Sequence, residues 1–193
     1  MAFKGKKPNM RIIFLSETDT FFLDVIAWIF FHLSIGYYFS RIPVDHFDPE
    51  KSWFLTKSWE KGGEIYQKLF RVKNWKRIIP SGAALYRNTY EIKHLRDMDI
   101  NGVCLWIKES CRSETCHWIM IIPGFFFYLW NTVEIGRLML VYAVVNNIVP
   151  IIMQRYNRPR ARKLLVQIKR RLELYEKPII IYESPTTYSH SYQ

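Results

Sequence analysis

Three apolar stretches alternate with polar, basic stretches along the chain and predict a mainly helical, integral membrane protein. The first, residues 21–39, is just long enough to cross a hydrocarbon layer as a helix. It follows a basic and polar segment, residues 1–20, and no small-residue cleavage site comes after it, so we expect a retained N-terminal anchor helix. Because ionisable groups are costly in hydrocarbon, we expect Asp24 to lie near the interface and His32 to face other helices.

The other two apolar stretches, residues 118–130 and 138–153, are short for complete spans. Each contains a breaker, Pro123-Gly124 in one and Pro150 in the other, so we expect a C-terminal re-entrant or tilted helical hairpin. The first eleven residues carry four basic side chains, and the segment after the last apolar stretch carries nine against three acidic ones. Both ends therefore favour the cytoplasmic side, and at least one apolar element is expected not to cross. We expect a single membrane-embedded domain over residues 21–171.

Two polar segments predict amphipathic helices at the membrane surface. In residues 53–75, Lys and Arg alternate with large aromatic side chains, which is typical of a surface-lying helix, here interrupted around Gly62-Gly63. A helix over residues 160–174 has leucine and isoleucine on one stripe and basic side chains on the other. Pro159 is expected to end the helix before it, and residues 172–193 are expected to form a tail.

Composition narrows the range of partners. Charged residues make up 23% of the chain, too many for a bundle of pure membrane spans, and aromatic residues make up 17%, which suits a protein at a membrane interface. The net charge of +11 predicts anionic partners such as membrane lipids or a phosphorylated carrier. Nucleic acid is not expected, because the basic residues flank apolar segments. The three cysteines, Cys104, Cys111 and Cys116, have no metal-ligand spacing and are expected to be reduced packing residues; no metal is expected.

The clearest candidate for chemistry is the pair Glu114 and His117. On a helix these residues lie one turn apart on the same face. The carboxylate can accept the imidazole Nδ1–H, which fixes the tautomer and leaves Nε2 as a general base for a hydroxyl that attacks an acyl thioester. The structural alternative is an interfacial anchor formed by His117 and Trp118, with an incidental acid nearby.

A second candidate, His94 with Asp99, has the spacing of the His-Asp pair in glycerolipid acyltransferases, but two residues at a fixed spacing are a weak signal. The sequence lacks a Gly-x-Ser-x-Gly elbow, and no cysteine has a family signature around it, so a covalent nucleophile has no support. Direct attack of the acceptor hydroxyl on the acyl donor is the simpler chemistry.

An oxyanion or a phosphorylated donor needs hydrogen-bond donors, and residues 154–160 supply a concentrated set of them. Planar guanidinium groups suit bidentate contacts to phosphate or carboxylate, whereas lysines would anchor the chain equally well. The run is thus either an anion site at the membrane surface or an anchor. The candidate donor-binding or oxyanion-binding residues are Asn147, Gln154, Arg155, Asn157 and Arg158.

The motifs of the chain resemble those of the glycosyl-4,4'-diaponeurosporenoate acyltransferases, which act last in bacterial synthesis of staphyloxanthin-type carotenoids. The matching pieces run in order over residues 40–171, and the last of them is the most specific. They are Arg41-Ile42-Pro43, Val72 with Trp75-Lys76, His94-Leu95, Glu114-x-x-His117-Trp118 with Pro123, Asn147, and the run Gln154 to Arg160.

The resemblance implies a membrane acyltransferase that esterifies a sugar hydroxyl, the glucose C6 position of a glycosylated C30 carotenoid acid or a related glycolipid. It implies an activated fatty acyl donor, acyl-CoA or acyl carrier protein, no cofactor, and a bacterial cell membrane with the active site at the cytoplasmic face. It also favours a catalytic role for Glu114 and His117. The alternative is a non-catalytic membrane adaptor that binds anionic lipid.

Overall fold

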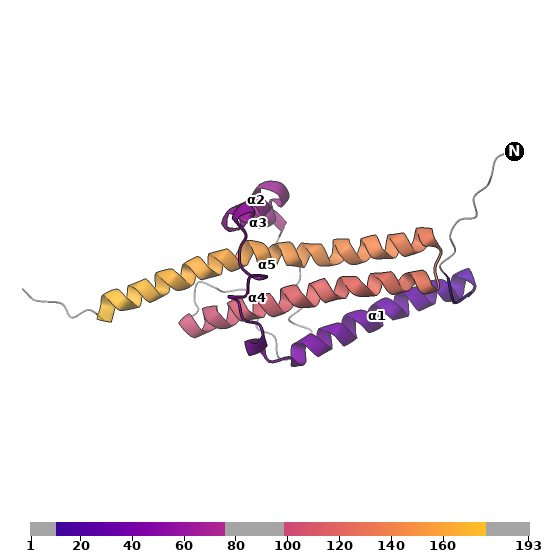
Figure 1. Ribbon diagram of the computed structural model, residues 1–193, viewed down its shortest axis with the longest axis horizontal. Helices are drawn as coiled ribbons and strands as arrows, with labels where there is room; N and C mark the ends of the chain where they lie inside the picture. Colours follow the sequence, from indigo (N-terminus) through magenta and orange to yellow (C-terminus); the bar gives the residue numbers. More distant parts are fainter. Residues whose placement is uncertain (1–10, 76–98, 177–193) are drawn as a thin grey trace, which may run out of the picture.

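The computed structural model describes residues 11–75 and 99–176, and helices dominate both parts (Figure 1). Neither part contains a strand. The elements in chain order are α1 (Glu17–Arg41), η1 (Val44–His46), η2 (Ser58–Gly63), α2 (Glu64–Phe70), α3 (Val72–Trp75), α4 (Ile100–Ile121), η5 (Ile122–Leu129) and α5 (Val133–Glu176). The mainly helical class predicted from the sequence is confirmed.

Helix α1 begins and ends where its sequence signals place it. The Ser16 side chain caps its first turn by accepting from the backbone N–H of Asp19 at 3.2 Å, and acidic residues follow at the positive end of the helix. It ends at Arg41, because Ile42 precedes Pro43 and is driven to an extended conformation.

The hairpin formed by α4, η5 and α5 is closely packed at two glycines (Figure 1). A Cβ on Gly136 would lie 2.6 Å from the Tyr128 ring, and a Cβ on Gly124 would lie 3.0 Å from the Ala143 Cβ. Pro123 stands at the start of the 3-10 segment, where its missing N–H costs little. Pro123 and Gly124 thus tighten the turn between the arms, whereas Pro150 lies inside α5 and does not break it, contrary to the prediction.

The first half of α1 lies against the turn of this hairpin. The Asp24 carboxylate is buried and accepts from Trp130 Nε1 and Asn131 Nδ2, both at 2.7 Å. Trp28 stacks on Phe127 with 4.5 Å between ring centroids, and its carbonyl oxygen lies 2.8 Å from His32 Nδ1. Both ionisable residues of the apolar stretch are therefore satisfied by neighbouring helices or their own backbone, which removes most of the cost of placing them there.

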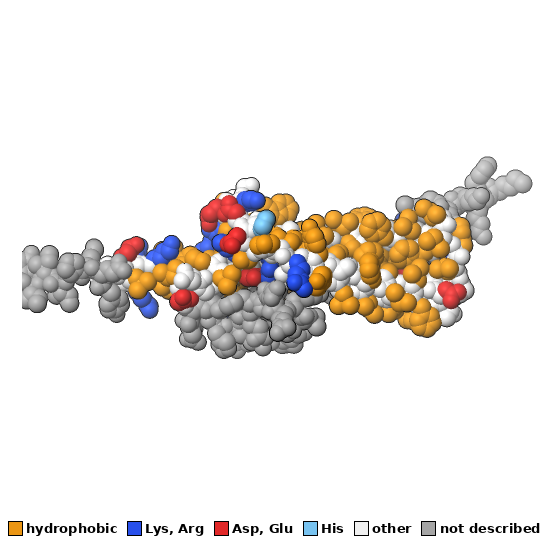
Figure 2. All heavy atoms as spheres, turned by 90° about the horizontal axis from the view of Figure 1, so that it is seen from below, with side chains coloured by type: hydrophobic (Ala, Val, Ile, Leu, Met, Phe, Trp, Pro, Cys, Tyr) orange, Lys and Arg blue, Asp and Glu red, His pale blue; other side chains and the backbone are white. Residues whose placement is uncertain are grey.

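One half of the molecule carries an apolar belt, made of α1, the end of α4, η5 and the first half of α5. Figure 2 shows hydrophobic side chains covering this half, with most charged side chains on the other half. Its exposed members include Ile26, Phe30, Phe125, Leu138 and Val145. Among the described elements, α1 and α5 are long and apolar enough to cross a membrane. Two such helices and this surface indicate a membrane protein; the re-entrant or tilted course of the hairpin stays a prediction.

The break expected around Gly62 and Gly63 in the surface helix of residues 53–75 is confirmed, but the segments on either side of it are not long helices. Residues 53–75 form an irregular segment, the 3-10 turn η2 and the short helices α2 and α3. Lys61, Gly62 and Gly63 all have positive φ, which ends any helix at this point. The buried faces of α2 and α3 pack on α5, where Tyr66 and Val72 contact Ile152 and Tyr156. Of the aromatic side chains in this region, Tyr66 and Phe54 are buried, whereas Trp53, Trp59 and Phe70 are exposed.

Pro159 does not end a helix, and the prediction that it would is wrong: α5 runs through it to Glu176. A proline in a helix leaves the carbonyl four residues earlier without its N–H partner, here that of Arg155. The backbone of Gly63 packs over this carbonyl, since a Cβ on Gly63 would lie 3.2 Å from the oxygens of Arg155 and Tyr156. Close packing at the interruption lets the helix continue.

The region 160–174 is helical, as predicted, but it continues the axis of the apolar half of α5 (Figure 1). Its apolar stripe, Leu164, Leu165 and Ile168, packs with Ala161 against α4. The partners on α4 are Val103, Trp106 and Ile107. The stripe is thus used by a neighbouring helix, and the expectation that this segment lies along the membrane surface is wrong.

Candidate active site

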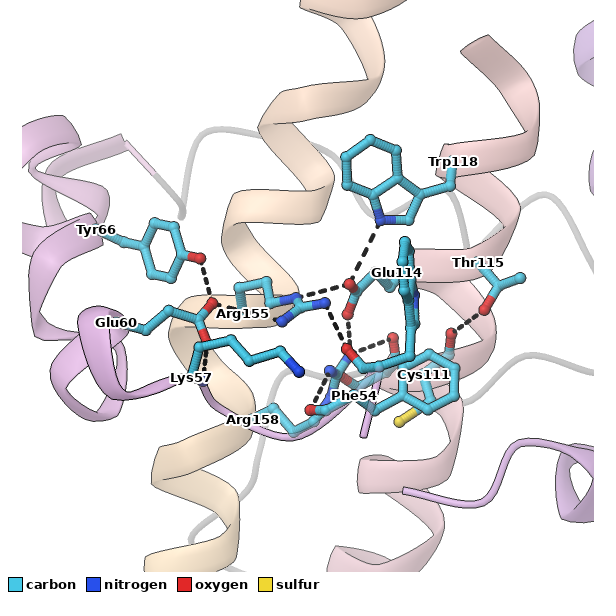
Figure 3. Close-up of polar contacts among 12 residues, drawn as sticks. Phe54, Lys57, Glu60, Tyr66, Cys111, Glu114, Thr115, Trp118, Arg155 and Arg158 are labelled. Atoms are coloured by element: carbon cyan, nitrogen blue, oxygen red, sulfur yellow. Dashed lines mark hydrogen bonds and ion pairs between the residues drawn. The ribbon is translucent and has the colours of Figure 1, made fainter. Parts of the chain in front are cut away.

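Four charged side chains are gathered with little exposure where the segment before α2 meets α4 and α5 (Figure 3). We call Glu60, Glu114, Arg155 and Arg158 the charged cluster. The Glu114 side chain is 0% exposed and that of Arg158 is 2% exposed. Buried ions are tolerated only if they are paired and fully hydrogen-bonded, so each contact in this cluster matters to the fold.

Glu114 lies between the two arginines. One carboxylate oxygen accepts from Arg155 Nε at 2.7 Å, and the other accepts from Arg158 Nη2 at 2.6 Å. Both oxygens are therefore engaged by guanidinium groups. The expected hydrogen bond from the carboxylate to His117 is wrong, because the arginines of α5 compete for the same acceptor and carry full positive charge.

Arg158 uses its whole guanidinium group. Besides Glu114, it donates from Nε to Ser110 Oγ at 3.0 Å, from Nη2 to Ser110 O at 3.1 Å and from Nη1 to Phe54 O at 3.1 Å. Its carbon also lies 5.4 Å from the centroid of the Phe54 ring. The expectation that Arg158 holds a donor or an oxyanion is at odds with this geometry, since its donors already hold α4, α5 and the segment before η2 together.

Arg155 links the same helices to Glu60, a residue that sequence reasoning missed. Its Nη1 lies 3.5 Å from Glu60 Oε1, and its Nη2 donates to Trp53 O at 2.7 Å. The Glu60 carboxylate also accepts from the Tyr66 hydroxyl and from the backbone N–H of Lys57. Burial, then the hydrogen bond and charge of Glu60, raise the pKa of the Tyr66 phenol.

A signal for Glu60 was present in the sequence. It is a lone acid between Lys57 and Lys61, just before the break at Gly62 and Gly63. A carboxylate among surface lysines is expected to be exposed to solvent. Only the fold shows that the Glu60 side chain is buried, with 1% of its surface exposed.

His117 is oriented by Asn147 on α5. The Asn147 amide donates from Nδ2 to Ala143 O at 2.8 Å, so its Oδ1 is the atom that lies 2.9 Å from His117 Nδ1. An oxygen acceptor at this position requires the proton on Nδ1. Nε2 is then the unprotonated, basic nitrogen, and among the described residues none is hydrogen-bonded to it. His117 thus has the tautomer that was predicted for a base, but the partner that sets it is Asn147 and not Glu114.

The remaining candidates have structural contacts of their own. Gln154 Nε2 donates to Ser113 Oγ at 3.3 Å, and Asn157 is half-buried on α5. Asp99 caps α4 by accepting from the backbone N–H of Gly102 at 2.8 Å. His94, its proposed partner, lies outside the described residues.

The thiol of Cys111 faces a core of Phe39, Phe47 and Phe54. Burial raises its pKa to about 11. A thiolate is the nucleophilic form of cysteine, so this thiol is inert at neutral pH. All three cysteines are reduced, in keeping with their predicted packing role.

Two tryptophans flank the charged cluster on its exposed side. The rings of Trp53 and Trp118 meet edge to face, with 6.1 Å between centroids. Trp53 is 55% exposed and Trp118 is 37% exposed. They lie beside the cluster, where Trp53 O accepts from Arg155 and Trp118 Nε1 lies 3.5 Å from Glu114 Oε1.

The charged cluster and the His117 imidazole lie at different levels along α4 and α5. His117 comes one turn after Glu114 on α4, and Asn147 comes two turns before Arg155 on α5. Because the two helices run antiparallel, the His117–Asn147 pair lies closer to the hairpin turn, and so to the apolar belt, than the charged cluster does.

The fold and its surface together define a helical membrane protein with a buried charged cluster beside its apolar belt. A family model described as glycosyl-4,4'-diaponeurosporenoate acyltransferase matches residues 50–167. Curated relatives of that name from Staphylococcus aureus are similar over 157 residues, with 36% identity for strain MRSA252 and 34% for strain N315. Each alignment covers 81% of this chain and 94% of the relative. No solved structure matches.

The chain therefore belongs to the glycosyl-4,4'-diaponeurosporenoate acyltransferase family, and it is an enzyme that transfers acyl groups. The resemblance drawn from its motifs is confirmed. The matched region begins just before the segment that supplies Glu60 and ends within α5, so it contains the charged cluster, His117 and Asn147.

Proposed function

We propose that this enzyme esterifies a sugar hydroxyl at the membrane, the glucose C6 position of a glycosylated C30 carotenoid acid or a related glycolipid, with a fatty acyl group. The printed name of its relatives supports an acceptor of this class. The observation that supports the chemistry is the hydrogen bond from His117 to Asn147, which leaves Nε2 basic at the rim of the apolar belt. The family assignment favours an enzyme over the non-catalytic adaptor that the sequence left open.

In the proposed reaction, His117 Nε2 takes the proton of the acceptor hydroxyl as its oxygen attacks the thioester carbonyl carbon. The new ester C–O bond forms and the C–S bond breaks. The thiolate leaves, and the proton held by His117 neutralises it as a thiol. The Nδ1 hydrogen bond to the Asn147 amide oxygen steadies the imidazolium that forms between these steps.

The charged cluster has a positioning role in this proposal. Glu114, Arg155 and Arg158 fix α4 against α5, and these two helices carry His117 and Asn147. A pair that must meet across two helices depends on their register, so a shift in the cluster would move the base from its partner. Gln154, Arg155 and Asn157 remain candidates for contacts to the donor or oxyanion once substrate is bound, whereas the Asn147 amide is already used by His117 and Ala143.

The proposed site lies where the apolar belt meets the half of the molecule that carries most of the charged side chains. We place this half at the cytoplasmic face because it is strongly basic. The donor is an activated fatty acid, as acyl-CoA or acyl carrier protein. No cofactor is required for this transfer, since the thioester already holds the acyl group in an activated form.

The test is acyl transfer by the purified enzyme in lipid nanodiscs. A glucosylated carotenoid acid and its 6-deoxyglucosyl analogue are supplied with each donor, and mass spectrometry follows the ester. We expect an ester on the glucosyl acceptor and none on the 6-deoxy analogue.

An ester on both acceptors would place the acyl group on another hydroxyl. No ester from either donor would contradict the proposed function.

A further inference from the structure

The last part of α5 projects beyond the body of the protein. In Figure 1 the yellow end of this helix extends past the start of α4. Its contacts with α4 end at Ile168, which packs with Val103, Trp106 and Ile107. The other face of the helix from Lys163 onward is exposed.

This exposed face carries a basic stripe, which we define as Lys163, Arg170 and Arg171. Lys163 and Arg170 lie two helical turns apart on one face with Val166 and Leu174 beside them, and Arg171 lies at the edge of this face. Val166 is 59% exposed and Leu174 is 63% exposed. Basic side chains around exposed apolar ones form a surface suited to an acidic protein partner.

The described residues leave the charges of the basic stripe without an acidic partner. Among the side chains of residues 11–75 and 99–174, no carboxylate pairs with any of its three members. By contrast, Arg162, one residue before the stripe, donates to Glu50 at 2.7 Å and to the Pro49 carbonyl at 2.6 Å. Within the described residues, Arg162 thus has an acidic partner and the stripe has none.

The position of the stripe argues against a membrane partner. For an α5 upright in the hydrocarbon layer with Gln154 at its edge, the stripe lies about 14 to 26 Å beyond that edge, at about 1.5 Å per residue. Charges are screened within about 8 Å at physiological salt. Lipid headgroups are thus too far away to hold these side chains.

We propose that the basic stripe docks an acidic acyl carrier protein, which delivers the fatty acyl thioester on its prosthetic arm. This inference rests on the proposed function, which requires an activated acyl donor at His117. A carrier seated on the stripe lies on the cytoplasmic side of the charged cluster, with its arm directed along α5 toward the membrane. The convex face of one helix offers a flat protein docking surface and does not enclose a nucleotide, so the carrier suits it better than coenzyme A.

The test reverses the charge of the stripe in the full-length enzyme, with Lys163→Glu, Arg170→Glu and Arg171→Glu combined. The matched control combines Lys51→Glu, Lys68→Glu and Lys73→Glu, which change the net charge equally at exposed lysines elsewhere. Binding of acyl carrier protein to the nanodisc-embedded enzyme is measured directly. The KM values for acyl carrier protein and acyl-CoA are measured beside it.

We expect the stripe variant to bind carrier protein about tenfold or more weakly and to raise its KM similarly, with kcat and the KM for acyl-CoA unchanged. The control should behave as wild type. The weakening should be the same in neutral and anionic nanodiscs.

Equal binding of carrier protein by wild type and the stripe variant would overturn the inference. A loss seen only in anionic nanodiscs would also overturn it, since it would assign the stripe to lipid. Because carrier binding is measured without turnover, it separates failure of this docking from failure of the proposed function, which would appear as loss of ester from both donors.

Discussion

Replacing Glu114 by glutamine separates a positioning role from a catalytic one. In the wild type, the two carboxylate oxygens serve Arg155 at 2.7 Å and Arg158 at 2.6 Å, with no exposure to solvent. An amide keeps one acceptor oxygen and turns an NH2 group toward the other guanidinium. One buried arginine then faces a donor and loses its counter-charge.

The cost follows from that geometry. Breaking a buried ion pair by removing one partner typically destabilises a fold by about 3–5 kcal/mol. For a chain of this size, each kcal/mol lowers the melting temperature by about 2–4 °C, so we expect Glu114→Gln to melt at least about 6 °C below wild type. The loss of activity should follow the loss of folded protein.

The assay is thermal unfolding by circular dichroism in nanodiscs, paired with kcat at a temperature where both proteins are folded. Glu109→Gln is the control, because it removes the acid of a different ion pair, with Arg112 at 2.7 Å one turn along α4, that does not join α4 to α5. The reasoning is refuted if Glu114→Gln melts like wild type while kcat collapses and its pH profile shifts. That result would indicate that Glu114 acts directly on His117 in catalysis.

Three further changes probe separate parts of the fold and site. Gly63→Ala should lower the free energy of unfolding by about 1–3 kcal/mol, because a Cβ would meet two carbonyls of α5 at 3.2 Å and φ is 85°. Gly62→Ala, which has open space around it, is the control and should lower it less. Equal melting temperatures of the two variants would contradict the packing of Gly63 at Pro159. Asn147→Ala should lower kcat about tenfold or more at unchanged KM, since His117 loses the acceptor for Nδ1–H; an unchanged kcat would remove Asn147 from the site. With the other two cysteines replaced by serine, Cys111 should react with iodoacetamide at pH 8 about 100-fold more slowly than an ordinary thiol, because a pKa of about 11 leaves few thiolates; rapid alkylation of the folded protein would show that the thiol is accessible.

Sequence patterns predicted the parts of this fold that are set by local chemistry. The apolar stretches predicted the helical class, while the cap at Ser16 was not predicted, although it follows the usual preference for serine at a helix start. His117 and Asn147 were both singled out, the first as a base and the second as a hydrogen-bond donor. The sequence could not show that these two side chains are hydrogen-bonded, because they are 30 residues apart and only the hairpin brings them together.

The errors came where tertiary contacts outweigh local preference. Pro159 is a strong helix breaker in a peptide, but a glycine from a distant segment packs on the carbonyl it frees. Glu114 has His117 one turn away, yet two arginines from another helix hold its carboxylate. In both cases the deciding partner is remote in sequence, so no local pattern could reveal it.

The central claim is that His117 is the base of an acyl transfer, and His117→Ala tests it most directly. Single-turnover ester formation is measured in nanodiscs with a glucosylated acceptor and an acyl thioester, after thermal unfolding has shown the variant to be folded. The account predicts a fall in rate of about 100-fold or more, in line with the usual contribution of general base catalysis. A folded His117→Ala enzyme that forms the ester at the wild-type rate would contradict it.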